Sequence, residues 1–394
     1  MTGNQPTRVL TLNAGSSSLK AALYAMGPGE ELALAAELTR IGGAGGRFQV
    51  RAAGRTVLDQ AVAPPDHAAA LELLMAWLAA QGGPAPAAVG HRVVHGGARY
   101  GEPTRVTPEL IAALRALEPI DPLHMPQALA GFAAVERSFP GIPQIACFDT
   151  AFHQAMPRLA KAYPLAASLD DEGIRRYGFH GLSYEFVLQA LREADPAAAH
   201  GRVILAHLGN GASMAAVLGG RPQDTTMGFS PTGGLMMGTR TGDLDPGVLL
   251  YLLRRNGADE LDALVNRQAG LLGVSGTSAD MRDLLAHEAT DARAQLAVDL
   301  FCYQARKALG GLAAVLGGLD TLVFTGGIGE HAPAVRARIC AGLGYLGVQL
   351  ADGHNAAGGP LISDPSGPVQ IRVIPTDEDR MIARHTHRVL AHGG

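Results

Sequence analysis

Three glycine-rich turns, each following an apolar run, are the stretches of this sequence best suited to chemistry. They are TLNAGSSSLK at residues 11–20, AHLGNGAS at residues 206–213 and FTGGIGE at residues 324–330. Glycine has no Cβ, so such turns bring bare N–H groups close to phosphate oxygens, and serine hydroxyls add donors. A single turn of this kind is more often a tight β-hairpin, but three in one chain favour phosphate binding. None is a P-loop, because no GxxxxGK[ST] occurs.

The elements around these turns alternate between strands and helices, which predicts an α/β protein. RVLTLNA and LKAALYAM read as strands on either side of the first turn, and residues 69–83 have helical spacing and end in glycines that can cap a helix. AAVGHRVVHGG at residues 87–97 and QIACFDTAF at residues 144–152 are short apolar strands that end in polar residues. Such endings predict a site at the strand termini.

The second half of the chain repeats the design of the opening. Residues 202–220 form an apolar strand, a turn of Gly, Asn and Ser, and another apolar strand. Aligning Ser18 with Ser213 gives an offset of 213 − 18 = 195 residues, close to half of the 394-residue chain. This short match predicts a duplicated domain, with chance similarity as the alternative. Residues 321–339 read as a buried strand, a glycine turn and the start of a helix, which suits an anion or a nucleotide.

Composition narrows the class of protein. A chain of 394 residues predicts two domains. The formal charge of −4 lacks the basic excess of a general nucleic-acid binder, so a small solute is the expected partner. Three widely spaced cysteines suggest neither a disulfide framework nor a zinc site. No signal peptide or membrane span is evident, so we expect a soluble cytoplasmic protein without a membrane partner.

Motifs along nearly the whole chain resemble the acetate kinase family, within the superfamily of acetate and sugar kinases, heat-shock chaperones and actin. The matching motifs, in chain order, are VLTLNAGSSSLK, GHRVVHGG, CFDTAFH, RRYGFHG, AHLGNGAS, DTTMGFSPTGGLMMGTRTGDLDP, GVSGTSADMRDL, FTGGIGE and IPTDED. The resemblance implies two duplicated ribonuclease-H-like (actin-like ATPase) domains with an active-site cleft between them. We expect residues 1–149 plus 381–394 to form the acyl-substrate domain, and residues 150–380 to form the nucleotide-binding and dimerisation domain. A homodimer is implied.

The resemblance implies a phosphotransferase with a carboxyl acceptor. The expected reaction is the reversible, Mg²⁺-dependent transfer of the ATP γ-phosphoryl group to acetate, giving acetyl phosphate and ADP by direct in-line transfer; Mn²⁺ is an alternative ion. Such chemistry asks the protein mainly to align two anions and to neutralise charge. The alternatives are a propionate or other short-chain carboxylate kinase, and an ATP-driven switch like actin or the chaperones.

Catalytic roles are carried over from matching motifs. Arg240 resembles the residue that stabilises the transferring phosphoryl group, and His180 would donate a further hydrogen bond to it. Asp149 matches a position with an acid/base assignment. Acetate is already ionised at neutral pH and has no proton to remove, so we expect Asp149 instead to position Mg²⁺ through water and to orient Arg92 or Arg240.

The remaining site residues also follow from the resemblance. Arg92 would hold the substrate carboxylate, and the apolar pocket walls expected around the methyl group are Val94, Leu123, Phe179 and Pro231. Asn13 and Glu378 match metal-associated positions, and His124 matches a histidine with a structural or positioning role. The residues expected to hold the nucleotide are Lys20, His207, Leu208, Gly209, Asn210, Gly211, Asp280, Met281, Arg282, Gly327, Ile328, Gly329, Glu330 and His331.

The sequence departs from the usual family pattern at several of these motifs. Tyr184 stands where histidine is usual, Leu182 where threonine is usual, and Met125 where asparagine is usual. SPTGG replaces the commoner TPLEG beside Pro231, which bears on acyl-chain preference, and His331 replaces an asparagine near the adenine. Acetate or propionate as acceptor, and ATP or pyrophosphate as donor, are therefore both left open.

Overall fold

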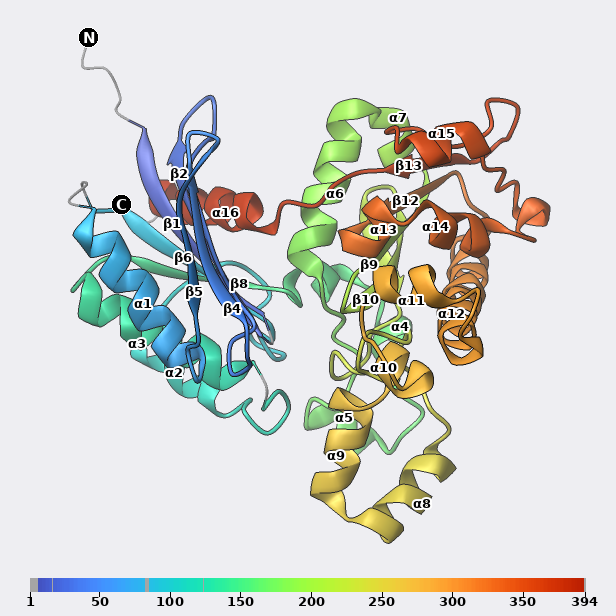
Figure 1. Cartoon of the computed structure of the whole chain (residues 1–394), viewed down its shortest axis with the longest axis horizontal. Coiled ribbons are helices and arrows are strands. Elements are labelled where there is room, and N and C mark those ends of the chain that lie inside the picture. The colour runs from blue at the N-terminus through green and yellow to red at the C-terminus, as the bar shows by residue number, and fades with distance from the viewer. Residues whose placement is uncertain (1–5, 16, 82–84, 123, 393–394) are drawn as a thin grey trace. The chain divides into compact units, whose positions relative to one another are not determined.

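The computed structural model describes residues 6–15, 17–81, 85–122 and 124–392 of the chain. The chain divides into two compact units: unit 1 is Met1–Ala151 with Asp377–Gly394, and unit 2 is Phe152–Thr376. Each unit is an α/β structure built on one sheet, as the sequence predicts (Figure 1). Residues 150–151 and 377–380, which we expected in the second domain, belong to unit 1. The second of these segments does so because α16 (Glu378–His392) begins there and packs on the sheet of unit 1.

The sheet of unit 1 has the strand order β5-β4-β3-β2-β1-β6-β8-β7. Strands β1 to β5 pair antiparallel in succession, whereas β1, β6 and β8 pair in parallel. The strands are β1 (Thr7–Ala14), β2 (Ser18–Met26), β3 (Glu31–Thr39), β4 (Gly46–Ala52), β5 (Arg55–Val62), β6 (Ala88–Val93), β7 (Thr104–Arg105) and β8 (Gln144–Phe148). The two strands predicted around the first turn are β1 and β2.

The faces of this sheet follow from the period of two along a strand. On β1, Leu10 and Leu12 join the core under α1 (His67–Ala80) and α3 (Met125–Ser138), while Val9 packs with Ala383 of α16. Thr11 and Asn13 therefore share the face that α16 covers. Close packing of α16 needs glycine on β6, since a Cβ at Gly90 would lie 2.2 Å from Thr386 Oγ1.

Local signals explain where the helices of unit 1 begin. Asp66 caps α1 by accepting a hydrogen bond from the Ala69 N–H, and Thr107 does the same for α2 (Pro108–Arg115), which has proline in its first turn. The helix predicted at residues 69–83 is α1, which begins two residues earlier and ends at Ala80. The glycines expected to cap it lie outside the described residues.

The sheet of unit 2 repeats the central strands of unit 1. Its order is β11-β10-β9-β12-β13, with β9–β10 and β10–β11 antiparallel and β9–β12 and β12–β13 parallel. This matches β3-β2-β1-β6-β8 in order and in sense, as a duplication requires. The strands are β9 (Arg202–Leu208), β10 (Ala212–Leu218), β11 (Arg221–Thr225), β12 (Thr321–Thr325) and β13 (Gln370–Val373).

One face of this second sheet packs against α6 (Gly181–Ala194). Val203 and Leu205 of β9 and Val217 of β10 form a core cluster with Leu188 of α6. By the same period of two, His207 of β9 and Ser213 of β10 lie on the face toward α6. The long helix α12 (Ala292–Leu316) is capped by Asp291 and packs against β9, β10 and β11.

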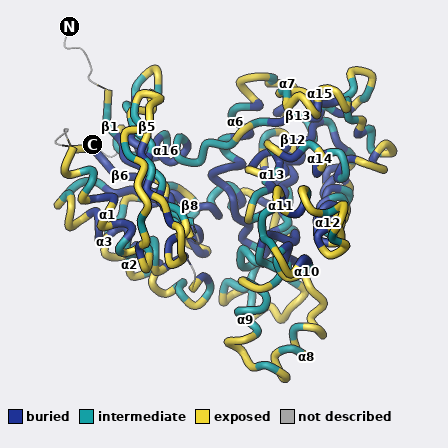
Figure 2. Tube along the Cα trace, viewed as in Figure 1, coloured by how far each residue is buried: buried dark blue, intermediate teal, exposed yellow. Residues whose placement is uncertain are grey.

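Shorter helices complete the fold, and the central strands of both sheets are buried while the edge strand β5 and helix α8 are largely exposed (Figure 2). These helices are α4 (Arg158–Lys161), α5 (Ala167–Asp171), α7 (Pro196–His200), α8 (Pro246–Asn256), α9 (Ala258–Arg267), α10 (Gly270–Ser275), α11 (Met281–His287), α13 (Gly326–His331), α14 (Pro333–Cys340) and α15 (Asp352–Ala357). Two short 3₁₀ helices span Ala151–Ala155 and Gly344–Leu346. None of the helices within the described ranges combines the length and apolarity needed to span a bilayer.

Candidate active site

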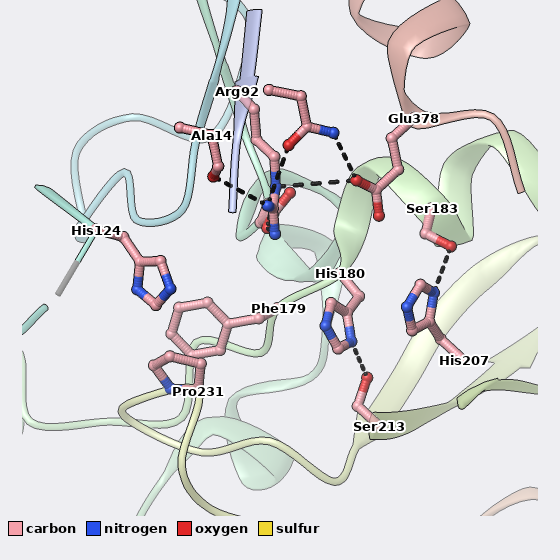
Figure 3. A network of polar contacts seen from close by, with 12 residues as sticks. Ala14, Arg92, His124, Phe179, His180, Ser183, His207, Ser213, Pro231 and Glu378 are labelled. Atoms are coloured by element: carbon pink, nitrogen blue, oxygen red, sulfur yellow. Dashed lines mark hydrogen bonds and ion pairs between the residues drawn. The ribbon is translucent and has the colours of Figure 1, made fainter. Parts of the chain in front are cut away.

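Charged side chains gather in unit 1 where β6 and β8 end. The two strands are parallel neighbours, with Arg92 opposite Cys147, so their carboxyl ends lie at one edge of the sheet. Asp149 directly follows β8. The Arg92 guanidinium donates from Nε and Nη2 to Asp149 Oδ2 at 3.0 and 2.6 Å. Figure 3 shows this guanidinium at the centre of a polar network.

Asn13 and Glu378 extend the network around Arg92. Arg92 Nη1 donates to Asn13 Oδ1 at 3.2 Å, and Asn13 Nδ2 donates to Glu378 Oε2 at 3.0 Å. Arg92 Nε lies 4.0 Å from the same Glu378 oxygen. Asn13 is on the face of β1 that α16 covers, and Glu378 is the first residue of α16. Because side chains alternate between the two faces of β1, Asn13 points toward α16 and meets Glu378. These are the two residues that the resemblance associates with a metal.

The electrostatics of this cluster are dominated by burial and ion pairing. Burial lowers the pKa of Arg92, but the carboxylates of Asp149 and Glu378 raise it by more, and the net shift is upward. Burial raises the pKa of Asp149, and the charge and hydrogen bonds of Arg92 oppose that shift. The guanidinium thus stays protonated, and a charged planar group of this kind suits a carboxylate ligand.

The same cluster has oxygen atoms suited to a hard cation. Asp149 Oδ1 is buried and has no hydrogen-bond partner among the described residues, which is costly unless a ligand satisfies it. Carboxylate and amide oxygens suit Mg²⁺, which keeps several waters and needs few protein ligands. Within the described ranges no three His, Cys, Asp or Glu side chains form a metal-binding group. A cation here would therefore take its other ligands from water and substrate.

In unit 2, two histidines and two serines pair crosswise. His180, at the N-cap of α6, hydrogen bonds through Nδ1 to Ser213 Oγ of β10 at 2.8 Å. His207 of β9 hydrogen bonds through Nδ1 to Ser183 Oγ of α6, also at 2.8 Å (Figure 3). The two imidazole rings stack with centroids 4.2 Å apart. The start of α6 supplies His180 and Ser183, and the β9–β10 hairpin supplies His207 and Ser213. Each ring is therefore held by a serine of the other segment.

The backbone at His180 is held in a conformation that few side chains adopt. Its φ of 60° lies in the left-handed region, which is strained for residues other than glycine and is concentrated at functional sites. Two residues earlier Gly178 has φ 75°, and a Cβ there would lie 2.7 Å from the His153 ring. This turn aims the His180 ring back toward β9 and β10.

Gly211 lies beside both His180 and Arg240. A Cβ added to Gly211 would lie 3.1 Å from His180 Nε2 and 4.0 Å from Arg240 Nη1. The Arg240 guanidinium also donates from Nη1 to the Pro231 carbonyl at 3.3 Å. An imidazole and a guanidinium therefore both face the side of Gly211 on which a side chain would project, here called the space above Gly211, and a transferring phosphoryl group would need donors placed in this way.

The second and third glycine turns lie beside this space. A Cβ on Gly209 would be 3.8 Å from His207 Nε2 and 3.9 Å from the Gly327 nitrogen, so the two turns adjoin. They do so because β9 and β12 are parallel and place their carboxyl ends at one edge. Gly326 has a φ of 77°, and a Cβ added to it would lie 2.8 Å from the Leu208 carbonyl oxygen.

A pocket of about 480 Å³ opens next to these turns. It falls in the size range of small-molecule sites, and its lining is mostly apolar with a few polar groups. Eight of the residues expected to hold the nucleotide line it, namely Gly209, Asn210, Asp280, Met281, Arg282, Gly327, Ile328 and His331. The geometry fits a planar base with its phosphates at the glycine turns.

Other expected site residues have different positions. Glu330 turns inward, since its Oε1 accepts the N–H groups of Gly326 at 2.9 Å and Thr376 at 3.2 Å. The Gly329 carbonyl accepts from buried Arg336, and Leu208 is fully buried, so both are part of the support beneath the turns. Lys20 is exposed on β2, opposite Asn13, in a depression that also includes Asp377 and Asp379.

The expected acyl-pocket residues are divided between the two units. Val94 is buried in unit 1, and Phe179 is buried in unit 2, where its carbonyl meets His153 Nε2 at 3.0 Å. Pro231 is partly buried in unit 2. Leu123 lies outside the described residues. His124 is buried and pairs with Asp121 at 2.7 Å, in keeping with a structural or positioning role.

Sequence reasoning missed the hydroxyl groups that support the histidines. Ser183, Ser213 and Tyr184 are fully buried and hydrogen bonded to or near His180 and His207. A usable signal existed, because pairing the hairpin at residues 202–220 puts Ser213 opposite His207, and Ser183 lies one helical turn after His180. The aspartate beside His124 was also missed.

Comparisons with known proteins find similarity over nearly the whole chain. The model of the Acetokinase family matches residues 8–384. The acetate kinase of Rhodopseudomonas palustris strain CGA009 is 49% identical over 402 aligned residues, covering 98% of this chain and 99% of that protein. A crystal structure of Porphyromonas gingivalis acetate kinase has a TM-score of 0.85 and 38% identity over 98% of this chain and 100% of its own. A propionate kinase from Francisella tularensis has a TM-score of 0.89 and 33% identity over 97% of this chain and 99% of its own.

Proposed function

The chain belongs to the acetokinase family, and we propose on that basis that it transfers the γ-phosphoryl group of ATP to acetate, reversibly, giving acetyl phosphate and ADP. The observation that carries the proposal is the convergence of His180 and Arg240 on the space above Gly211, beside a nucleotide-sized pocket. Phosphoryl transfer needs alignment and charge neutralisation rather than a covalent protein intermediate. This arrangement supports direct in-line transfer.

The chain's own residues divide the work between the two substrates. Gly209, Asn210 and Gly327 would hold the phosphates while Asp280–Arg282 and His331 border the base. Arg240 would neutralise charge on the moving group, and His180 would donate one hydrogen bond to it. Arg92, held by Asp149, would orient the acceptor carboxylate so that one of its oxygens is the nucleophile.

Mg²⁺ fits the donor set of unit 1 as the metal of the reaction. When bound, the ion would neutralise negative charge on the nucleotide phosphates. Asp149, through its unpartnered Oδ1, and Glu378 and Asn13 are the residues that would hold it, mainly through water. Mn²⁺ prefers similar oxygen ligands and is the alternative ion.

Propionate is the second candidate acceptor, because a propionate kinase is among the similar structures. One methylene is worth only about 1–3 kcal/mol of discrimination in an apolar pocket. The test is hydroxylamine trapping of acyl phosphate with acetate, propionate and butyrate in parallel. Each acid is paired with ATP, GTP or pyrophosphate in the presence of Mg²⁺.

The outcomes of that assay separate the alternatives. Product from acetate and ATP supports the proposal, and preference for a longer acid keeps the mechanism and changes the acceptor. Product with pyrophosphate alone would overturn the ATP assignment and direct attention to His331, whose side chain is 78% exposed at the pocket. No acyl phosphate from any pair would reject the acyl kinase.

We further propose that the protein acts as a cytoplasmic homodimer. Large apolar side chains are exposed along α12, namely Leu296, Tyr303 and Val315, and such side chains support a packing surface for a second copy. Sedimentation of the wild-type chain and of Tyr303→Glu tests this. A monomer in both cases would exclude the dimer, and a dimer that Tyr303→Glu leaves intact would exclude this surface.

A further inference from the structure

Behind the His180 ring, a chain of buried hydroxyl groups runs away from the reacting space. Ser213 Oγ bonds His180 Nδ1 at 2.8 Å, and the Tyr184 hydroxyl bonds the same Ser213 oxygen. Ser213 and Tyr184 are both 0% exposed, so water does not compete for these bonds.

The direction of each hydrogen bond in this chain can be worked out from proton counts. Burial raises the pKa of Tyr184, so its hydroxyl keeps its proton. Ser213 Oγ is the hydrogen-bond partner that the described residues offer the fully buried Tyr184 hydroxyl, and a buried donor without an acceptor is costly, so the tyrosine proton goes to Ser213 Oγ. Ser213 then has its own proton left, and His180 Nδ1 is within reach to accept it.

We propose that Tyr184 and Ser213 are positioning residues that hold His180 as the neutral tautomer with its proton on Nε2. The Nε2 atom is the one that borders the space above Gly211. In the opposite tautomer Nε2 would present a lone pair to an incoming phosphoryl oxygen, and the contact would be repulsive. The hydroxyl chain therefore keeps the donor aimed at the group that moves, without reorganisation during the reaction.

The crosswise partner of His180 strengthens this assignment. His207 stacks on the His180 ring at 4.2 Å and is itself held by Ser183. A 180° rotation of the His180 ring would put Cδ2 in place of Nδ1 and Cε1 in place of Nε2, and so would break the Ser213 bond. The stack therefore fixes the plane of the ring, the Ser213 bond fixes which edge faces Gly211, and the hydroxyl chain fixes the tautomer.

The inference rests on the proposed phosphoryl transfer, so its test has a readout that needs no turnover. In protein labelled with ¹⁵N-histidine, the His180 signals, assigned with His180→Gln, report which ring nitrogen carries the proton. We expect a protonated Nε2 and an unprotonated Nδ1 in the unaltered chain. A protonated Nδ1 would overturn the proposal whether or not the enzyme makes acyl phosphate. Absence of acyl phosphate with the expected tautomer would reject the proposed function alone.

Kinetics of matched variants provide the second readout. Ser213→Ala should lower kcat by about 10- to 100-fold, as loss of an orienting partner typically does, and should leave both KM values within about threefold. Tyr184→Phe keeps the ring and should lower kcat less, and the double variant should lose no more than Ser213→Ala. In both single variants the two His180 nitrogen signals should move toward averaged values.

The control is Tyr177→Phe, which removes another largely buried tyrosine hydroxyl whose partner is the Gly173 carbonyl. It should leave kcat within about twofold of the unaltered enzyme. A fall in kcat for Tyr184→Phe and Ser213→Ala with unchanged His180 signals would assign both residues a purely structural role and overturn the proposal. An unchanged kcat in both variants would also overturn the proposal. If Tyr184→Phe fails to fold, the kcat and the His180 signals of Ser213→Ala still test it.

Discussion

Gly211→Ala is the sharpest perturbation of the proposed reacting space, because it adds one methyl group where the phosphoryl group should pass. The new Cβ would lie 3.1 Å from His180 Nε2 and 3.4 Å from Cε1. The first distance is a few tenths of an ångström shorter than an ordinary contact. The His180 ring cannot easily yield, since Ser213 and the His207 ring hold it.

The magnitude follows from what the methyl group displaces. Overpacking of this size costs about 1–3 kcal/mol of stability, and we expect the lower end because the loop borders open space. Loss of one preorganised donor costs about 2.7–4 kcal/mol of barrier, equivalent to a factor of about 10²–10³ in kcat. The pocket that would hold the base does not include Gly211, so ADP affinity should change by less than about tenfold.

The assay is acyl-phosphate trapping at saturating substrates, with ADP affinity from calorimetry and stability from urea denaturation. Gly353→Ala is the matched control, because Gly353 lies in α15 with no atom within 4 Å of its added Cβ. That variant should keep full activity. A folded Gly211→Ala enzyme with kcat within about threefold of the parent would refute the placement of the phosphoryl group above Gly211.

Three further predictions concern the support around the site. Asp149→Asn leaves the buried Arg92 charge without its main partner, so activity should be lost at all pH values and the free energy of unfolding in urea should fall by about 3 kcal/mol. Partial rescue of activity by high Mg²⁺ would support the metal role of Asp149, while a shifted pH profile without Mg²⁺ dependence would contradict it. Glu330→Ala frees the Gly326 and Thr376 N–H groups and should weaken ADP binding about tenfold by calorimetry, and unchanged binding would show that the turn needs no such cap. Burial lowers the pKa of His91 to about 3, below its ordinary value of 6.5, so its contribution to stability is lost as pH falls below that ordinary value. His91→Leu should therefore reduce the loss of unfolding free energy between about pH 7 and 5 by about 2 kcal/mol, and an identical pH dependence in both proteins would contradict a neutral buried His91.

The strands around the glycine turns could be predicted because their signals are local. An apolar run, a turn of small residues and a second apolar run specify a hairpin, and this is what β1–β2 and β9–β10 form. The offset between Ser18 and Ser213 also indicated a repeat, and the two sheets share their central strand order. Alternation along those strands then decides which side chains face α16 and which face α6.

The parts of the site that depend on long-range packing could not be predicted from local residue patterns, and Asn13 and Glu378 were expected at one site only through the resemblance. Glu378 meets Asn13 only because α16 returns to the first sheet, across a separation of 365 residues. Glu330 was expected among the residues that hold the nucleotide, yet its Oε1 turns inward and accepts the Gly326 and Thr376 N–H groups, and Thr376 lies 46 residues away. The role of Tyr184 depends on Ser213, 29 residues away on another element.

Duplication of one sheet explains how a single chain obtains two chemically different edges. In each unit the first strand, here β1 or β9, has a parallel neighbour, so a hairpin turn and the end of a following strand share an edge. In unit 1 that edge has gained charge, with Arg92 between Asp149 and Glu378, and a fixed guanidinium suits a carboxylate. In unit 2 it has glycines, hydroxyl groups and imidazoles, which suit phosphate oxygens. The two copies have thus kept the strand order that creates a site and diverged in the residues that decide what it binds.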